Sequence, residues 1–184
     1  PYTTLFRSGV RFRLPASMNQ VEYFGRGPAE NYLDRNAGSM VGLYKSTAEE
    51  LYFPYVRPQE NGHHTDTRWV SLSTGKKGLL IQADNTIGFN ALRNSIEDFD
   101  DEEATGLSRQ WSNFTPEQVA NHDEAAAKNV LRRQHHINDI TPRDFVEVCV
   151  DLKQQGVAGY DSWGSRPEPA YTLPANREIG RAHV

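Results

Sequence analysis

The sequence predicts an all-β protein whose short strands are arranged as an antiparallel sandwich. Three observations support this: apolar residues recur with period two, turn residues divide these runs, and only one stretch has a helical pattern. The 184 residues suffice for one ordinary domain with a core, or for part of a larger domain.

Six short runs show the alternation expected of strands. They are 10–16, 20–25, 68–74, 78–84, 87–93 and 144–152. The last run is the clearest, because every second residue from Val146 to Leu152 is aliphatic and these residues share one face. Turns are predicted at Gly25 to Pro28, Asn61-Gly62, Gly75 with Gly78, and residues 156–164. Many short strands between such turns favour a sandwich.

One stretch, residues 115–136, has the pattern of a helix. Thr115 is a suitable N-cap, Pro116 suits the first helical position, and Gln118 completes a capping box. Its apolar stripe is thin, which predicts a single surface helix inserted among the strands. An acidic loop, residues 97–106, precedes it.

Composition excludes several classes of function. The net charge is −4 with no basic stripe, so no nucleic-acid partner is expected. The mean hydropathy of −0.70 and the lack of a long apolar run argue against a membrane span. Cys149 is alone, which excludes an intrachain disulfide and a cysteine-based zinc site, and predicts a small buried side chain.

The two ends of the chain have a separate origin. Residues 1–8 (PYTTLFRS) and residues 178–184, which end in IGRAHV, match what short-read sequencing adaptors encode when translated in frame. We therefore expect neither end to be native and assign residues 9–177 to one truncated β-sandwich domain.

Short patterns that often carry chemistry are weak here. In the acidic run, Glu103 stands where a calcium loop needs its glycine, so a solvated loop is expected. The stretch GRGPAE lacks the third glycine of a phosphate loop. The pairs His63-His64 and His135-His136 cannot chelate a metal from a strand, because neighbouring side chains point to opposite faces. Exposed or core-capping histidines are expected, and no metal site.

Carboxylates do not form an evident catalytic pair. Glu22, Glu30 and Glu60 could in principle supply the two carboxyls of a retaining glycosidase, but nothing in their spacing favours this. Glu30 and Glu60 lie in turn-rich stretches, where bonding to backbone amides is the common role.

Residues 156–164 (GVAGYDSWG) place a tryptophan in a glycine-rich loop. Trp163 could close the end of a core, as large aromatic side chains commonly do. Alternatively, its flat face could serve a ligand such as a sugar, because loops on rigid scaffolds concentrate binding residues. The residues alone leave both interpretations open.

Three longer motifs are more specific than any of these patterns. YFGRGPAENYLDR (23–35), YVRPQENGHHTDTRW (55–69) and QQGVAGYDSWG (154–164) occur in this order and at these separations. Together they resemble the C-terminal, small-chain domain of large bacterial β-galactosidases of glycoside hydrolase family two. The resemblance covers about the last three-fifths of that domain.

The resemblance implies a galactose-mutarotase-like supersandwich, present in part. It implies a parent enzyme that hydrolyses terminal β-D-galactosides with retention, whose catalytic glutamates lie in a barrel domain of the same polypeptide. No catalytic residue, metal ligand or cofactor is expected in this chain, whereas the parent would use Mg²⁺ and a monovalent cation elsewhere. The isolated chain is expected to be inactive and the parent to be a homo-oligomer.

The family's contribution from this domain is the aromatic residue of its DSW motif, which lines the substrate entrance. It maps onto Trp163, with Asp161 and Ser162 as its supports. The family usually has Gly-Gly-Asp before DSW, whereas this chain has Ala158, Gly159 and Tyr160. An alanine there limits positive backbone φ angles. The motifs GRGPAENY and RPQENG are interpreted as structural.

Two alternatives remain open at this stage. A purely structural dimerisation domain would bury Trp163 in the intact protein. A stand-alone carbohydrate-binding or aldose-mutarotase-like sandwich would need a general acid and base, for which His64 with Glu60 could be imagined. The compartment, cytoplasmic or periplasmic, is not determined by the sequence.

Overall fold

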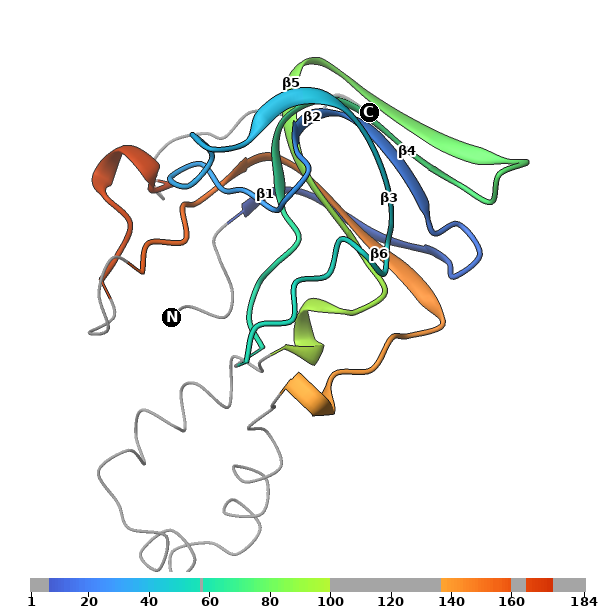
Figure 1. Ribbon diagram of the computed structural model, residues 1–184. Helices are drawn as coiled ribbons and strands as arrows, with labels where there is room; N and C mark the ends of the chain where they lie inside the picture. Colours follow the sequence, from blue (N-terminus) through green and yellow to red (C-terminus); the bar gives the residue numbers. More distant parts are fainter. Residues whose placement is uncertain (1–6, 57, 100–136, 160–164, 174–184) are drawn as a thin grey trace, which may run out of the picture.

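The computed structural model describes residues 7–56, 58–99, 137–159 and 165–173. These residues form one antiparallel sheet of six strands, which is strongly curved (Figure 1). The strands are β1 (Arg7–Pro15), β2 (Gln20–Gly27), β3 (Met40–Thr47), β4 (His64–Ser73), β5 (Gly78–Leu92) and β6 (Phe145–Gln154). Their order across the sheet is β1-β6-β5-β4-β2-β3. The all-β class is confirmed, and this sheet is consistent with one layer of a β-sandwich domain.

The described residues also contain three short 3₁₀ helices and no long one. They are η1 (Ile96–Asp98), η2 (Ile137–Asp139) and η3 (Pro169–Tyr171). The helix predicted at 115–136 lies outside the described residues. None of the described helices is long and apolar enough to span a membrane.

Two strand predictions need correction. The runs 78–84 and 87–93 form a single strand, β5, which spans fifteen residues. Strand β3 was missed, because MVGLYKST contains a glycine and three hydroxyl side chains and shows little alternation. The other four runs overlap β1, β2, β4 and β6, with ends shifted by up to four residues.

The turn predicted from Gly25 to Pro28 begins later, because β2 continues to Gly27. A Cβ atom at Gly25 would collide with Thr67 of the neighbouring strand β4. This glycine is therefore required for the close approach of two strands. The turn between Gly75 and Gly78 is confirmed, since it joins β4 to β5, and Gly75 has a φ angle of 82°.

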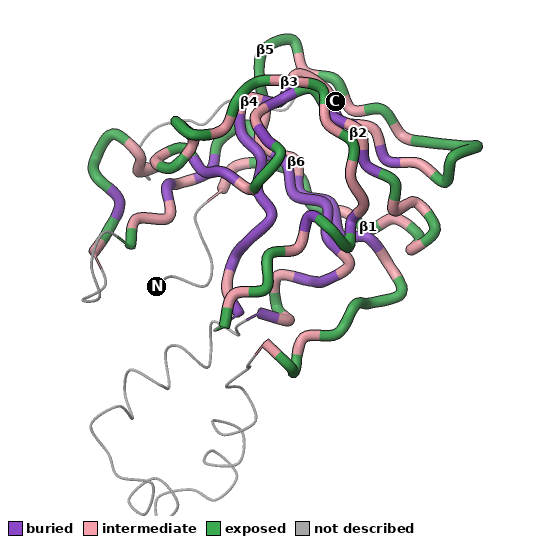
Figure 2. The backbone as a smooth tube through the Cα atoms, in the orientation of Figure 1, coloured by how far each residue is buried: buried purple, intermediate pink, exposed green. Residues whose placement is uncertain are grey.

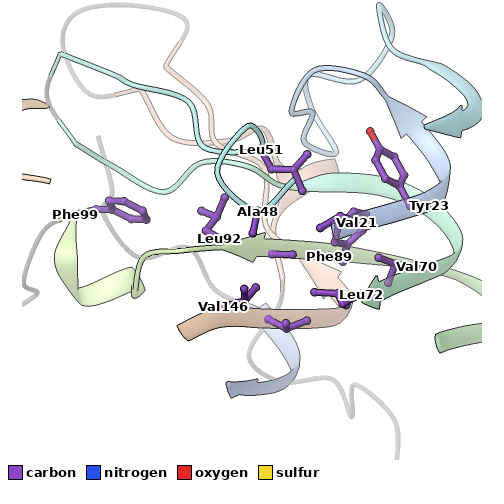
Figure 3. Packing of buried hydrophobic residues seen from close by; sticks show 12 residues of the cluster. Val21, Tyr23, Ala48, Leu51, Val70, Leu72, Phe89, Leu92, Phe99 and Val146 are labelled. Atoms are coloured by element: carbon purple, nitrogen blue, oxygen red, sulfur yellow. The ribbon is translucent and has the colours of Figure 1, made fainter. Parts of the chain in front are cut away.

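The hydrophobic core lies on one face of the sheet (Figure 3). Val70 and Leu72 of β4, Phe89 of β5, and Val146 and Val148 of β6 are all fully buried there. Leu51, from the segment that follows β3, joins the same cluster. Complete burial of such side chains stabilises a fold by about 1.5–3 kcal/mol each.

The opposite face is divided into two unlike halves. On β6, Glu147, Cys149 and Asp151 alternate with the core valines and are nevertheless 1–3% exposed. On β3, most residues are exposed or half-exposed, as Figure 2 shows. The alternation of β6 therefore gave the correct core face, but its second face is also covered.

Candidate functional site

The residues predicted to contact substrate, Asp161, Ser162 and Trp163, lie outside the described residues. The structure does describe residues 154–159, which lead into them and which we call the loop stem. What holds the loop stem in place determines where the rest of the loop starts.

Asp34 holds the loop stem through its carboxylate. Its Oδ1 accepts a hydrogen bond from the backbone N–H of Val157 at 3.0 Å, and its Oδ2 accepts one from Ala158 at 2.8 Å. Gly156 lies directly against this carboxylate, because a Cβ atom there would collide with it. The N–H of Gly156 donates to the carbonyl of Tyr171 at 2.9 Å. The loop stem is therefore fixed from two sides.

The loop stem turns through two residues with positive φ angles. Ala158 has a φ angle of 56° and Gly159 one of 81°. We expected the alanine to limit such angles, yet the backbone adopts the left-handed conformation there. For an L-residue this costs roughly 1–2 kcal/mol. The N–H groups of Val157 and of Ala158 itself both donate to Asp34, and these hydrogen bonds offset the cost.

The first two motifs are bound to each other by Asn31 and Glu30. Asn31 accepts hydrogen bonds through Oδ1 from the N–H and the hydroxyl of Thr65, at 2.9 and 2.6 Å. Glu30 accepts one through Oε2 from the N–H of Gly62 at 2.6 Å, where the φ angle of 72° requires glycine. Arg35 and Tyr55 donate to its other oxygen. The structural interpretation of both motifs, and the backbone bonding of Glu30, are confirmed.

Glu60 joins the second motif to the third. Its Oε1 accepts hydrogen bonds from Arg7 at 2.7 Å, from Asn90 at 3.0 Å and from Gln154, in the loop stem, at 3.4 Å. These partners are side chains, so the expectation that Glu60 bonds to backbone amides is wrong. Desolvation raises the pKa of the Glu60 carboxyl, although the Arg7 guanidinium and the three donors oppose this.

Asp151 lies beside this group and is 1% exposed. Arg7 approaches its Oδ2 at 3.7 Å, but neither carboxylate oxygen has a hydrogen-bond partner among the residues that the structure describes. Burial raises the pKa of Asp151 to about 7, with Arg7 lowering it and Glu60 raising it. Asp151 is therefore a carboxyl that titrates near neutral pH.

The two described histidines are buried rather than exposed. The Nδ1 of His63 lies 2.7 Å from Asn90 Oδ1, and its ring stacks on Tyr32. His64 stacks on Phe89 in the core. Burial lowers the pKa of His63 to about 3 and that of His64 to about 4, so both are neutral at pH 7. No group of three metal-ligating side chains occurs within the described ranges. His135 and His136 lie outside them.

The arrangement of these groups does not favour mutarotation. His64 and Glu60 share no hydrogen bond or ion pair, since His64 pairs through Nδ1 with Tyr23 and with the carbonyl of Arg26. A cavity of about 10 Å³ borders Glu60 and Asn90, and this volume holds one water molecule at most. A sugar ring does not fit there.

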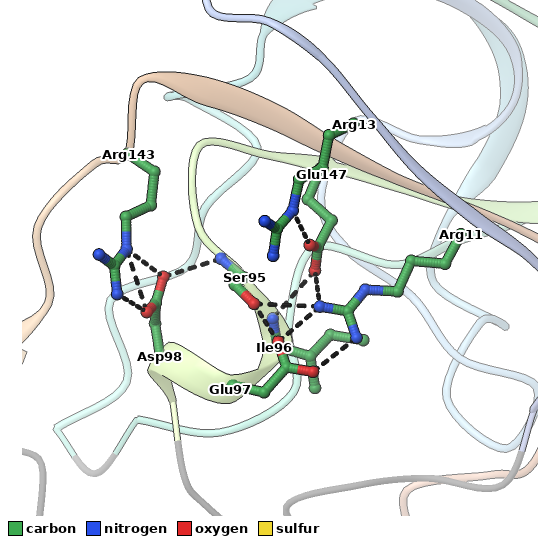
Figure 4. A network of polar contacts seen from close by, with 8 residues as sticks. All are labelled: Arg11, Arg13, Ser95, Ile96, Glu97, Asp98, Arg143 and Glu147. Carbon is green, nitrogen blue, oxygen red and sulfur yellow. Dashed lines mark hydrogen bonds and ion pairs between the residues drawn. The ribbon is translucent and has the colours of Figure 1, made fainter.

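A second polar network lies at the other end of β6 (Figure 4). Glu147 is 3% exposed and accepts hydrogen bonds from Arg13 and from the N–H of Ile96, both at 3.1 Å. Arg11 pairs with it at 2.8 Å. Arg11 also bonds to Glu97, and this lowers the pKa of Glu97 to about 2. The carboxylate of Glu147 thus joins β1, β6 and η1.

The residues on either side of segment 100–136 are tied together. Asp98 and Arg143 form an ion pair through several hydrogen bonds. Arg143 also donates its N–H to the carbonyl of Arg93 at 2.6 Å, and Asn94 bonds to the carbonyl of Thr141 at 2.9 Å. The described residues that precede this segment, 93–98, are therefore bonded to those that follow it, 141–143.

Sequence reasoning missed Asp34, Asn90, Glu147 and Asp151. Asp34 stands in the first motif, so its position was visible but its role was not. Glu147 and Asp151 alternate with buried valines, which ordinarily indicates exposure to solvent. Cys149 was correctly predicted to be buried, and burial raises the pKa of its thiol to about 12.

Comparison with known proteins extends the likeness beyond the three motifs to most of the chain. The family described as "Beta galactosidase small chain" matches residues 1–181. A β-galactosidase of Priestia megaterium is 33% identical over 170 residues, which are 92% of this chain and 13% of the relative. One of Staphylococcus xylosus is 33% identical over 179 residues, 97% of this chain and 14% of the relative.

A third relative is more similar over a shorter stretch. The β-galactosidase of an Arthrobacter species is 41% identical over 98 residues, which are 50% of this chain and 10% of the relative. The chain thus spans between 10% and 14% of the length of these three relatives.

Proposed function

This chain belongs to the beta galactosidase small chain family, and from that premise we propose that its parent protein hydrolyses terminal β-D-galactosides with retention. The names of the similar proteins support the substrate class. Because the chain spans only 13% of the Priestia megaterium relative, the activity belongs to the complete parent and not to this part.

In this proposal both catalytic carboxylates lie in a barrel domain of the same polypeptide. A retaining mechanism needs a nucleophile and an acid/base about 5–5.5 Å apart, with a glycosyl-enzyme intermediate between its two steps. In this chain, Glu30 and Glu60 are committed to holding the motifs together. The Mg²⁺ and the monovalent cation implied by the family would also be bound outside this chain.

The chain itself would complete the substrate entrance. Trp163 would offer its indole face to the sugar, with Asp161 and Ser162 as neighbours. The observation that carries this role is that Asp34 anchors the loop stem at Val157 and Ala158. Ala158 lies two residues before Tyr160 in the sequence. A loop with a fixed origin can present a side chain to another domain at a lower entropic cost than a free one.

Two experiments test the proposal. The isolated chain should not hydrolyse a chromogenic β-galactoside, and turnover by the pure chain would contradict the assignment of chemistry to the barrel. In the complete parent enzyme, Trp163→Ala should weaken the binding of substrate and of a galactose analogue by about 1–3 kcal/mol. Trp163→Phe, which keeps an aromatic face, should retain most of the affinity. Equal KM and inhibitor constants in all three proteins would exclude the stacking role.

A further inference from the structure

The two edge strands of the sheet differ in how they are protected. Strand β1 carries three arginines that are all ion-paired, a β-bulge between Ser8 and Gly9, and a proline at its end. These are the features by which natural sheets prevent pairing with another strand. Strand β3 pairs with β2 without any bulge from Met40 to Thr47, contains no proline and has one lysine. Among the described residues it is a regular edge with no further strand beside it.

The face beside β3 is apolar and exposed. Leu43 pairs with Phe24 of β2, which pairs in turn with Trp69 of β4. Val41 lies on the same face of β3, and Leu80 on the same face of β5. We call these five residues the apolar strip. Leu43 and Leu80 are 59% and 60% exposed, so they contribute little to this chain's own stability.

Four charged residues that border the apolar strip form two ion pairs, and the guanidinium of Arg68 lies 5.6 Å from the centre of the Phe24 ring. Lys45 pairs with Glu22 at 3.6 Å, and Arg26 with Asp66 at 2.5 Å. A strongly charged partner would have no free counter-charge among these four residues. An extended segment with apolar side chains at alternate positions fits both features, because its backbone can pair with β3 and its side chains can cover the strip.

We propose that β3 and the apolar strip bind a β-strand from the part of the parent polypeptide that lies outside this chain. The relatives supply the reason for this occupant, since about seven-eighths of the Priestia megaterium protein lies outside the matched region. Within one polypeptide such a strand is present at high effective concentration. An unpaired edge of this kind would otherwise promote aggregation. The inference uses family membership and is independent of the galactosidase activity.

The test uses this chain with two probes. The probes are the segments immediately preceding the matched regions of the Priestia megaterium and Staphylococcus xylosus relatives, each produced as a separate polypeptide. Leu43→Lys places a charge in the strip, and Val10→Lys is the matched control, because Val10 is 60% exposed on the other edge strand. Circular dichroism and thermal unfolding establish that both variants are folded, and light scattering gives the oligomeric state.

We expect at least one probe to bind the wild-type chain and Val10→Lys equally, and Leu43→Lys at least tenfold more weakly. Binding should also slow amide hydrogen exchange in β3 and leave β1 unchanged, a readout that does not depend on any variant. The proposal is overturned if neither probe binds, or if both variants bind alike. It is also overturned if the chain forms a dimer that Leu43→Lys dissociates while no probe binds, since the occupant would then be a second copy.

Discussion

On the face of the sheet opposite the core, the side chains of one half are buried and those of the other half are exposed to solvent. In the half formed by β1, β6 and the end of β5, Asn90, Glu147 and Asp151 are 1–5% exposed beneath ion pairs and loops. In the half formed by β2, β3 and β4, the apolar strip faces solvent. We call these halves the covered half and the open half.

The difference runs against the usual distribution of side chains, because charged groups are buried in the covered half and apolar groups are exposed in the open half. The covered half contains its own partners, because arginines of β1 pair with Glu147, Asp151 and Glu60. The open half has no such cover among the described residues. The comparison teaches that the described residues bury this face of the sheet at β6 and leave it exposed at β3.

The largest expected effect is a difference in stability between two variants, each of which removes an ion-paired glutamate from one half. Glu147→Ala should lower the free energy of unfolding by about 3 kcal/mol, because it removes a buried partner of two arginines and of the Ile96 N–H. Glu22→Ala, whose ion pair with Lys45 is exposed, should cost less than about 0.5 kcal/mol. Urea unfolding of both variants measures the difference. An equal loss of unfolding free energy in the two variants would contradict the contrast between the two halves.

The next effect concerns the anchor of the loop stem. Asp34→Ala leaves the Val157 and Ala158 amides without their acceptor, so we expect a loss of about 2 kcal/mol and faster exchange of these two amides. Asp84→Ala, at an exposed position of β5, is the control and should change neither. Unchanged exchange in Asp34→Ala would show that the loop stem is held by other contacts.

Asp151 makes the stability of the covered half depend on pH. Its pKa is raised to about 7 in the folded chain, so its contribution is fully present below about pH 4 and is lost as the pH rises through 7. Over that interval, ionisation lowers the free energy of unfolding by up to about 1.4 kcal/mol per pH unit.

His63 acts in the opposite direction, because its lowered pKa costs stability as the pH falls below about 6.5. The difference between the wild type and Asp151→Asn isolates the aspartate: the variant should gain stability relative to the wild type as the pH rises from 4 to 8. Parallel curves would contradict a raised pKa of the buried Asp151 carboxyl.

The smallest expected effect is a gain of stability. Ala158→Gly relieves the positive φ angle of 56° and should raise the free energy of unfolding by about 0.5–1 kcal/mol. Ala83→Gly, in the middle of β5, should lower it by a similar amount, because glycine weakens a strand. Thermal unfolding compares the two, and a loss in Ala158→Gly would mean that the turn is not strained.

Much of the fold could be predicted from the sequence, since the core face of β6 follows from its alternating valines. What could not be predicted depends on cover from distant residues. Nothing near Glu147 in the sequence reveals that Arg11, Arg13 and the N–H of Ile96 surround it. Strand β3 was missed for the converse reason, because its regularity comes from pairing with β2 and not from its own composition.

The candidate site was predicted in outline only. The first motif contains Glu30, Asn31 and Asp34, which proved to anchor the other two motifs. The contact between Asp34 and the loop stem, however, spans 123 residues or more. Such a contact leaves no local signal. Trp163 stays a prediction, carried by the resemblance and by the fixed loop stem.

Residue-resolved amide hydrogen exchange of the isolated chain tests the contrast between the two halves most directly. If the covered half is complete and the open half is not, the amides of β6 should exchange roughly a hundredfold more slowly than those of β3. Equal protection of the two strands would mean that β3 is already covered. The division of this face into a covered half and an open half would then be wrong.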